Sequence, residues 1–214
     1  MSDDVKPDLR AARIADTEEK ILQAATRLFL ERGYNGTTLA AVAAEAAVGA
    51  RTVYVRFGTK AALLKRVVDV ALVGDTTPVD VQGRPWFVLA RTAPTLAERI
   101  AAMARGGKEM MARAGGVLAV AFEAAPMEPE LAAASQAGRE ATREHLHVFW
   151  TQAAADGLLP GSADLDWLAE TSAILTVAET YLLATRMHGW SPEQYEQWIA
   201  TSLTRMAGAA GTAR

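Results

Sequence analysis

Apolar side chains recur at helical spacing along almost the whole chain. Between Thr17 and Arg32 they fall on one stripe, at the i, i+4, i+7 and i+8 positions, which is the pattern of an amphipathic helix. Asp16 and Glu19 have the spacing of a capping box at the start of this helix, and Gly33 favours a stop at its end. No segment alternates apolar and polar residues with the β-branched enrichment of a strand. The pattern therefore predicts an all-α protein.

Three shorter helices are expected next. Turn-forming residues come first, and Thr37 is suited to cap a helix from about Thr38 to Ala46. A further helix is expected from about Ala50 to Phe57, and Thr59 is the expected cap of a fourth. The first third of the chain is thus expected to hold four helices.

Residues 74–94 interrupt the helical pattern with three prolines, two glycines and three threonines. This change of composition makes the segment the expected boundary between two domains. We expect a flexible arm at residues 1–15, a helical domain at 16–73 and a larger helical domain at 74–214. The helices expected beyond the boundary cover residues 94–113, 115–125, 128–156, 164–188 and 192–208.

The helices expected at 38–46 and 50–57 have the form of a helix-turn-helix. A short corner joins them, and the small residue Ala43 allows the second helix to cross closely over the first. In such a unit the second helix enters the major groove of DNA, where its outward side chains meet base edges. No acidic residue lies between Glu45 and Asp69 to pair with the basic residues of this helix. We expect these side chains to be unpaired within the protein, because their partner is DNA.

The charge distribution supports this interpretation, although the total charge does not. The chain has a formal net charge of −3, but residues 1–73 carry 11 basic and 9 acidic side chains, whereas residues 74–214 carry 11 and 16. A basic N-terminal part on an acidic remainder can bind a polyanion locally and repel it elsewhere. The acidic bulk argues against a protein that compacts DNA without sequence preference.

About fifty residues of this region share their order and spacing with a known family. The matching residues are Ile21, Leu22, Ala24, Ala25, Leu28, Phe29, Gly33, Tyr34, Thr37, Thr38, Leu39, Val42, Ala43, Ala46, Val48, Thr52, Val53, Tyr54, Phe57, Lys60 and Leu63. With them, residues 17–64 resemble the N-terminal domain of the TetR (tetracycline repressor-like) family of bacterial transcriptional regulators. Two departures occur at the turn, since Ala47 stands where the family usually has glycine and Gly49 where it often has serine. An alanine forced to positive φ costs about 1 kcal/mol.

The outward side chains of the second helix can then be given roles as hypotheses. Arg51 can bind O6 and N7 of guanine in a bidentate manner, and Thr52 and Ala50 can contact a thymine methyl or a phosphate. The remaining polar side chains are expected to grip phosphates, with Lys60 at a helix N-terminus. Any one of them taken alone is more often a solvated surface residue, and that alternative stays open. The expected DNA-contacting residues are Thr38, Gly49, Ala50, Arg51, Thr52, Tyr54, Arg56 and Lys60, with Arg10 and Arg13 as basic residues of the arm.

The same resemblance implies a small-molecule pocket and a dimer interface in the domain at 74–214. Such a pocket is largely apolar, with a few polar groups that fix the orientation of the ligand. The residues expected to line it are Met103, Met110, Met111, Phe122, His147, Phe149, Trp150, Trp167 and Glu179. Members of the family usually pair through their last two helices, and the alternative is that these helices form the core of a single chain. The expected interface residues are Leu168, Leu175, Ala178, Leu182, Tyr195, Trp198, Ile199 and Leu203.

The sequence contains few residue patterns that are typical of a catalytic site or a metal site. The absence of cysteine excludes disulfides, thiolate zinc sites and cysteine nucleophiles. Glu144 and His147 match the Glu-x-x-His spacing of di-iron bundles, but the second copy that such a site needs is missing. We therefore expect no enzymatic activity, no cofactor and no metal.

The resemblance implies a regulator, commonly a repressor, that binds a palindromic operator on double-stranded DNA as a homodimer and is released by a small-molecule effector. No apolar stretch is long enough for a membrane span or a signal peptide, so we expect a cytoplasmic bacterial protein with no membrane partner. The alternative is an all-α ligand-binding protein or enzyme that keeps the helix-turn-helix only as scaffold.

Overall fold

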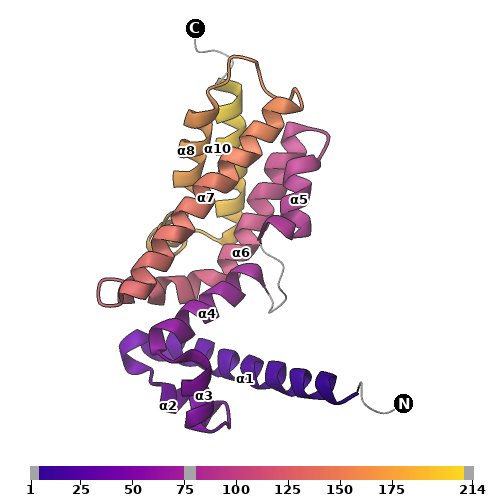
Figure 1. Ribbon diagram of the computed structural model, residues 1–214. Coiled ribbons are helices and arrows are strands. Elements are labelled where there is room, and N and C mark those ends of the chain that lie inside the picture. Colours follow the sequence, from indigo (N-terminus) through magenta and orange to yellow (C-terminus); the bar gives the residue numbers. More distant parts are fainter. Residues whose placement is uncertain (1–4, 75–80, 210–214) are drawn as a thin grey trace. The chain divides into compact units, whose positions relative to one another are not determined.

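The computed structural model describes residues 5–74 and 81–209, and every regular element within these ranges is helical (Figure 1). This confirms the all-α prediction. The first four helices are α1 (Val5–Gly36), α2 (Leu39–Glu45), α3 (Ala50–Phe57) and α4 (Lys60–Val73). The later elements are η1 (Val81–Gly83), α5 (Pro85–Thr92), α6 (Leu96–Ala124), α7 (Pro129–Ala155), α8 (Leu165–Thr176), α9 (Ala178–Leu182), the π-helical segment η2 (Leu183–Met187) and α10 (Pro192–Ala209).

The chain divides into two compact units. The N-terminal unit comprises the described residues up to Asp69 together with Gly116–Ala134, and the C-terminal unit comprises Val70–Gly115 and the described residues from Ser135 onward. The division expected from the sequence followed chain order. It did not anticipate that a segment from the middle of the chain belongs with the first helices.

Helix α1 begins at Val5 and not at Thr17. Arg10 and Arg13, which were expected in a flexible arm, lie exposed on this helix, while residues 1–4 lie outside the described part of the chain. The Ala-, Leu- and Arg-rich segment before Thr17 has high helix propensity, so the helix extends through it. The expected capping box is wrong, because Asp16 lies within the helix and its carboxylate pairs with Nζ of Lys20 at 2.7 Å.

The turn after α1 forms where the sequence predicted it, but a different threonine caps the next helix. Gly33 has φ 66°, which breaks the helical backbone as expected. Oγ1 of Thr38 accepts a hydrogen bond from the amide of Ala41 at 3.1 Å, so Thr38 is the N-cap of α2. Thr37 is instead buried, and its hydroxyl donates to the carbonyl oxygen of Leu28 at 3.1 Å. The expected cap of α4 is confirmed, since the amide of residue 62 donates to Oγ1 of Thr59 at 2.9 Å.

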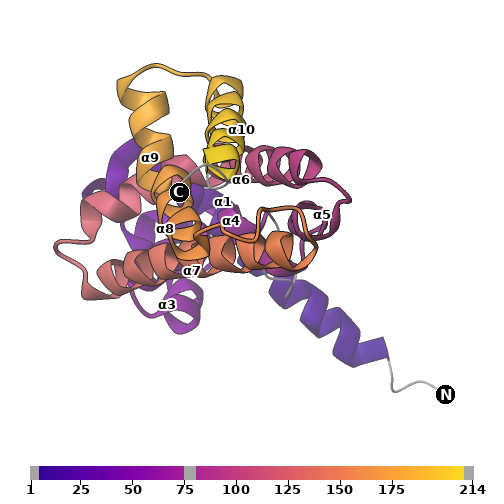
Figure 2. The same cartoon turned by 90° about the horizontal axis from the view of Figure 1, so that it is seen from above.

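In the larger part of the chain two expected helices fuse and one divides. Helix α6 continues through Gly115 and Gly116, where a break was expected, because tertiary packing overrides the weak helix propensity of glycine. A Cβ on Gly115 would lie 3.0 Å from the ring of Tyr181, so the missing side chain makes room for that ring. The helix expected at 164–188 ends at Thr176, because Val177 has an extended backbone with ψ 154°. Within the C-terminal unit α8 packs beside α10 (Figure 2).

Within the described ranges, no helix combines the length and the apolar character needed to cross a membrane.

Candidate functional site

Helices α2 and α3 form a helix-turn-helix held by small apolar contacts. Val42 and Val53 are fully buried and Ala43 is 2% exposed, so the two helices cross closely, as the sequence predicted. Gly49 is the N-cap of α3 and has no side chain to cap it. Ala47 has φ 53° and is the only non-glycine residue with positive φ in the described part of the chain. The turn therefore keeps a left-handed backbone although glycine is absent there.

The outer face of α3 presents side chains that have no side-chain partner among the described residues. Arg51, Thr52 and Tyr54 are exposed, and none of the three forms a side-chain hydrogen bond or ion pair with the described residues. Val55 is 77% exposed and lies one helical turn after Arg51, on the same side of the helix. Val55 is not among the residues predicted to contact DNA, although its place four positions after Arg51 could have indicated it.

Arg56 does not belong to this free set. Its guanidinium forms an ion pair with Glu18 of α1, and the same carboxylate pairs with Nη2 of Arg66 on α4 at 2.9 Å. Burial raises the pKa of Glu18, but hydrogen bonds from the two arginines outweigh it, so the pKa lies below its ordinary value. The expectation that Arg56 lacks a protein partner was wrong, because its acid lies 38 residues earlier in the chain. We call Glu18, Arg56 and Arg66 the Glu18 cluster.

Lys60 is also partly engaged. Its Nζ donates to the carbonyl oxygen of Tyr34 at 2.7 Å and lies 4.0 Å from the centroid of the Tyr34 ring. The Tyr34 hydroxyl in turn donates to Glu128 at 2.8 Å, which ties α4, the end of α1 and the segment before α7 within the N-terminal unit. An ammonium has three donors. Lys60 can therefore hold this structure and still contact a phosphate.

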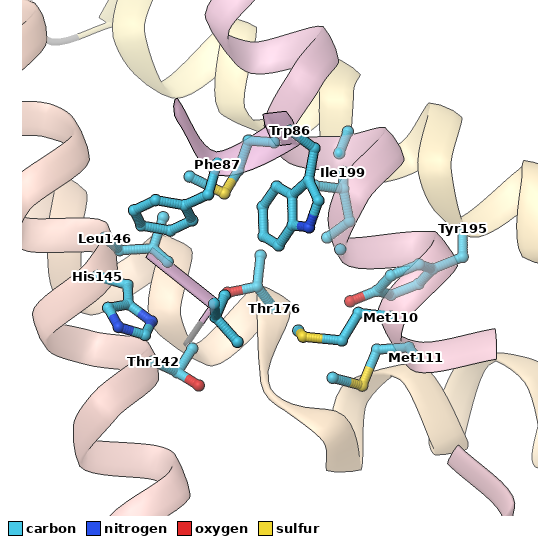
Figure 3. A pocket seen from close by; sticks show the side chains of 14 residues that line it. Trp86, Phe87, Met110, Met111, Thr142, His145, Leu146, Thr176, Tyr195 and Ile199 are labelled. Atoms are coloured by element: carbon cyan, nitrogen blue, oxygen red, sulfur yellow. The ribbon is translucent and has the colours of Figure 1, made fainter. Parts of the chain in front are cut away.

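A cavity lies within the C-terminal unit, among α5, α6, α7 and α10 (Figure 3). It encloses about 540 Å³ of empty space, part of it open to solvent. The described residues that line it are Val81, Trp86, Phe87, Met103, Ala104, Gly107, Met110, Met111, Thr142, His145, Leu146, Thr176, Tyr195 and Ile199.

Two adjacent glycines of α6 shape this cavity. A Cβ on Gly106 would lie 2.1 Å from Cδ2 of Trp86, so the indole rests directly on the helix backbone at that position. A Cβ on Gly107 would meet nothing within 4 Å, and this glycine lies on the cavity wall. Because neither glycine carries a side chain, the indole can approach the helix and the space beside it stays open.

The methionines predicted to line a pocket do so, whereas the other predicted residues do not. Trp150 is fully buried and donates through Nε1 to Oγ of Ser172 at 3.0 Å, so it belongs to the core. Glu179 pairs with Arg139 at 2.8 Å. Four other residues also lie elsewhere: Phe149 is buried beside Trp150, Phe122 is half-buried in the N-terminal unit, Trp167 is 46% exposed, and His147 is exposed at 3.6 Å from Asp166.

His145 lines the cavity in place of His147. Two residues apart on a helix, the two imidazoles point in different directions, and only the first faces α5. The ring of His145 meets that of Phe87 edge to face, with centroids 5.2 Å apart. The choice between these histidines depends on the packing of α5 against α7, which the sequence does not reveal.

The residues predicted for a dimer interface separate into two groups. Tyr195, Ile199 and Leu203 are 2%, 2% and 0% exposed, because α10 turns them toward the core of its own unit, and they are unsuited to contact a second chain. Leu168 is fully buried as well. The other predicted residues, Leu175, Ala178, Leu182 and Trp198, are half-buried. Apolar side chains that are exposed on α8 and η2 are Trp167, Ile174, Leu183 and Met187.

No group of three or more His, Asp or Glu residues within the described ranges is arranged to hold a metal ion. The polar hollow between α7 and α8, lined by Arg143, Glu144, His147, Asp166, Ala169 and Glu170, is consistent with a solvated surface.

Comparisons with known proteins agree with this architecture. Residues 21–67 match the family described as "Bacterial regulatory proteins, tetR family". A transcriptional regulator from Pseudomonas aeruginosa PAO1 is similar in structure with a TM-score of 0.69 and 18% identity, over 92% of this chain and 93% of that one. A TetR-family regulator from Mesorhizobium loti has a TM-score of 0.67 and 19% identity, over 94% and 98%.

The structure of MexZ, described as a key repressor responsible for antibiotic resistance in Pseudomonas aeruginosa, has a TM-score of 0.60 and 20% identity, over 89% of this chain and 94% of that one. No curated protein sequence matches the chain. The structural likenesses establish the fold, and the match at residues 21–67 identifies the helix-turn-helix domain. Residues 21–67 therefore belong to the DNA-binding domain of the TetR family of bacterial regulatory proteins, and the chain has the fold of TetR-family transcriptional regulators. Regulators of this family are DNA-binding proteins and not enzymes.

Proposed function

We propose that this protein is a transcriptional repressor that binds a palindromic operator as a homodimer and is released from it by a small-molecule ligand. One observation carries the DNA-binding part: Arg51 and Tyr54 are exposed on α3 without a side-chain partner among the described residues. A guanidinium presented in this way can bind guanine through O6 and N7. The hydroxyl of Tyr54 is suited to a phosphate, and Val55 to the methyl group of thymine.

Dimerisation would give two copies of α3 the spacing of two successive major grooves, about 34–36 Å or a multiple of it. The exposed apolar side chains of α8 and η2 support this part of the proposal. Trp167 and Ile174 are seven residues apart, and Leu183 and Met187 are four apart, so each pair shares one side of its helix. Large exposed apolar side chains of this kind are typical of protein–protein contacts.

Release by a ligand is supported by the cavity among α5, α6, α7 and α10. A ligand that binds more tightly to one conformer of the dimer shifts the population toward it. If that conformer separates the two recognition helices by the wrong distance, the operator is released. A ligand with equal affinity for both conformers would leave DNA binding unchanged.

Selection of bound fragments from a random pool of DNA tests the proposal, because it reports both the preferred bases and the half-site spacing. With the selected duplex, Arg51→Ala should weaken binding by about 1–3 kcal/mol and relax the preference at one base position. Arg205→Ala removes the same charge from an exposed position on α10 and serves as the control. If the protein binds no duplex at low ionic strength, or if the two variants behave alike, the DNA-binding proposal is wrong and the ligand-binding alternative gains support.

Analytical ultracentrifugation tests the dimer separately. Ile174→Lys should increase the dissociation constant of the dimer, because it places a charge in a surface that association would bury. Val88→Lys changes an apolar residue of α5 that is 46% exposed and should have no effect. A dimer that survives Ile174→Lys unchanged, or a monomer at every concentration, would refute the interface.

A further inference from the structure

The cavity of the C-terminal unit has walls that suit a flat apolar group. The indole of Trp86 lies centrally, with the rings of Phe87 and Tyr195 on either side and the thioethers of Met110 and Met111 below (Figure 3). Aromatic faces favour offset or edge-on contact with another ring, and methionine side chains adapt to its outline. A ring system is therefore the shape that these walls fit.

Three hydroxyl groups also line the cavity, and each already donates a hydrogen bond to a backbone carbonyl oxygen. Thr142 donates to the carbonyl oxygen of Gly138 at 2.9 Å, and Thr176 donates to that of Ser172 at 2.8 Å. Tyr195 donates to the carbonyl oxygen of Leu175 at 3.2 Å. A hydroxyl has one donor and two acceptor lone pairs. The oxygen atoms of these three hydroxyl groups can therefore accept a hydrogen bond from a ligand, but the groups have no further proton to donate.

Charge on the ligand would find no partner among the described lining residues, which include no aspartate, glutamate, lysine or arginine. A carboxylate, which only accepts hydrogen bonds, cannot satisfy the three hydroxyl oxygens, and its charge would be buried without a counter-charge, which is costly. An ammonium would be buried away from a counter-charge, which is costly. The indole N–H of Trp86 on the cavity wall can donate to an acceptor of the ligand, but the hydroxyl oxygens of Thr142 and Thr176 can be satisfied only by a donor of the ligand.

Resting on the proposed release by a ligand, we infer that the effector is an uncharged, ring-bearing molecule that donates a hydrogen bond, such as a phenol or an N–H heterocycle, to the hydroxyl oxygens of Thr142 and Thr176. The ring packs against Trp86, and the donor group points toward α7 and the end of α8 (Figure 3).

Isothermal titration calorimetry with three probes that share one ring tests this inference on the full-length protein. The probes are 1-naphthol, which donates a hydrogen bond, 1-methoxynaphthalene, which cannot, and 1-naphthoate, which is anionic. We expect 1-naphthol to bind about tenfold more tightly than 1-methoxynaphthalene, since one hydrogen bond contributes on that order. 1-Naphthoate should bind more weakly than either.

Variants identify the atoms responsible. Thr142→Val and Thr176→Val keep the shape of the side chain and remove its oxygen, so at least one should abolish the preference for 1-naphthol over 1-methoxynaphthalene. Thr151→Val, at an exposed position of α7 outside the lining, should keep it. Gly107→Leu adds a side chain where a Cβ meets nothing within 4 Å, and should abolish binding of all probes by filling the cavity. Circular dichroism would verify that each variant is folded.

Equal affinities of 1-naphthol and 1-methoxynaphthalene, tighter binding of 1-naphthoate, or no binding of 1-naphthol by the folded protein would each overturn the inference. Operator binding, measured in parallel by fluorescence anisotropy, separates this result from the proposed function. A protein that binds DNA but fails the probe series refutes the ligand class alone. A protein that prefers 1-naphthol through Thr142 or Thr176 but keeps its operator supports the ligand class and refutes release.

Discussion

The Glu18 cluster should contribute measurably to stability, and Glu18→Gln tests this. The Glu18 carboxylate accepts hydrogen bonds from Arg56, from Nε of Arg66 at 3.0 Å and from Nη2 of Arg66 at 2.9 Å, and its side chain is only 18% exposed. Removal of a hydrogen bond to a charged group lowers the free energy of unfolding by about 1.5–3 kcal/mol. Solvent screens the arginines, which are 29% and 39% exposed, and glutamine keeps the shape and one acceptor. We therefore expect a loss of about 2 kcal/mol in the free energy of unfolding.

Urea unfolding at several pH values provides the assay. The folded-state pKa of Glu18 lies below its ordinary value of 4.5, so the stabilisation is fully present above that value. It is lost as the pH falls through the lowered pKa, because the carboxylate then takes up a proton. The difference between wild type and Glu18→Gln should accordingly be large at pH 7 and shrink in acid. Glu19→Gln, at the adjacent exposed position, is the control and should change stability by less than about 0.5 kcal/mol. Equal stability of the two variants, or a difference that does not change with pH, would refute this account.

Three further substitutions have definite expected outcomes. Ala47→Gly should stabilise the protein by about 0.5–1 kcal/mol in urea unfolding, because glycine adopts positive φ without the alanine penalty but loses more entropy on folding; a destabilised variant would contradict this. Gly106→Ala should displace Trp86, seen as altered near-ultraviolet circular dichroism and weaker 1-naphthol binding, whereas Gly138→Ala, where a Cβ meets nothing within 4 Å, should change neither. Lys60→Met should weaken binding to all DNA sequences alike and lower the salt dependence by about one unit; an unchanged slope would assign this lysine to structure alone.

Local patterns were sufficient to predict most of the helices. The spans of α3 and α10, the break at Gly33 and the cap at Thr59 follow from signals within a few residues of each feature. The start of α1 was missed because a plausible cap at Asp16 was given more weight than the helix propensity of the residues before it. The expected break at Gly115 was wrong because this glycine was interpreted as a turn residue. It lies within the helix, and its missing side chain makes room for the ring of Tyr181.

Site predictions from the sequence were limited wherever a partner is distant along the chain. Arg51 and Tyr54 lie exposed as predicted, and their contacts with DNA stay predictions. Nothing near Arg56 in the sequence signals its ion pair with Glu18, because that pair depends on how α1 crosses α3. The cavity depends in the same way on helix packing, which decides that His145 and not His147 faces it.

The division of labour within α3 has a consequence for how regulators of this kind diversify. Val53, which anchors the helix, is fully buried, whereas Arg51 and Val55 contribute nothing to the interior. After duplication of the gene, these two exposed positions can be exchanged at little cost in folding free energy. Under the proposed function each exchange would present a new chemical surface to the bases, and descendants with different target genes would then arise from one scaffold by changes confined to a single helical turn.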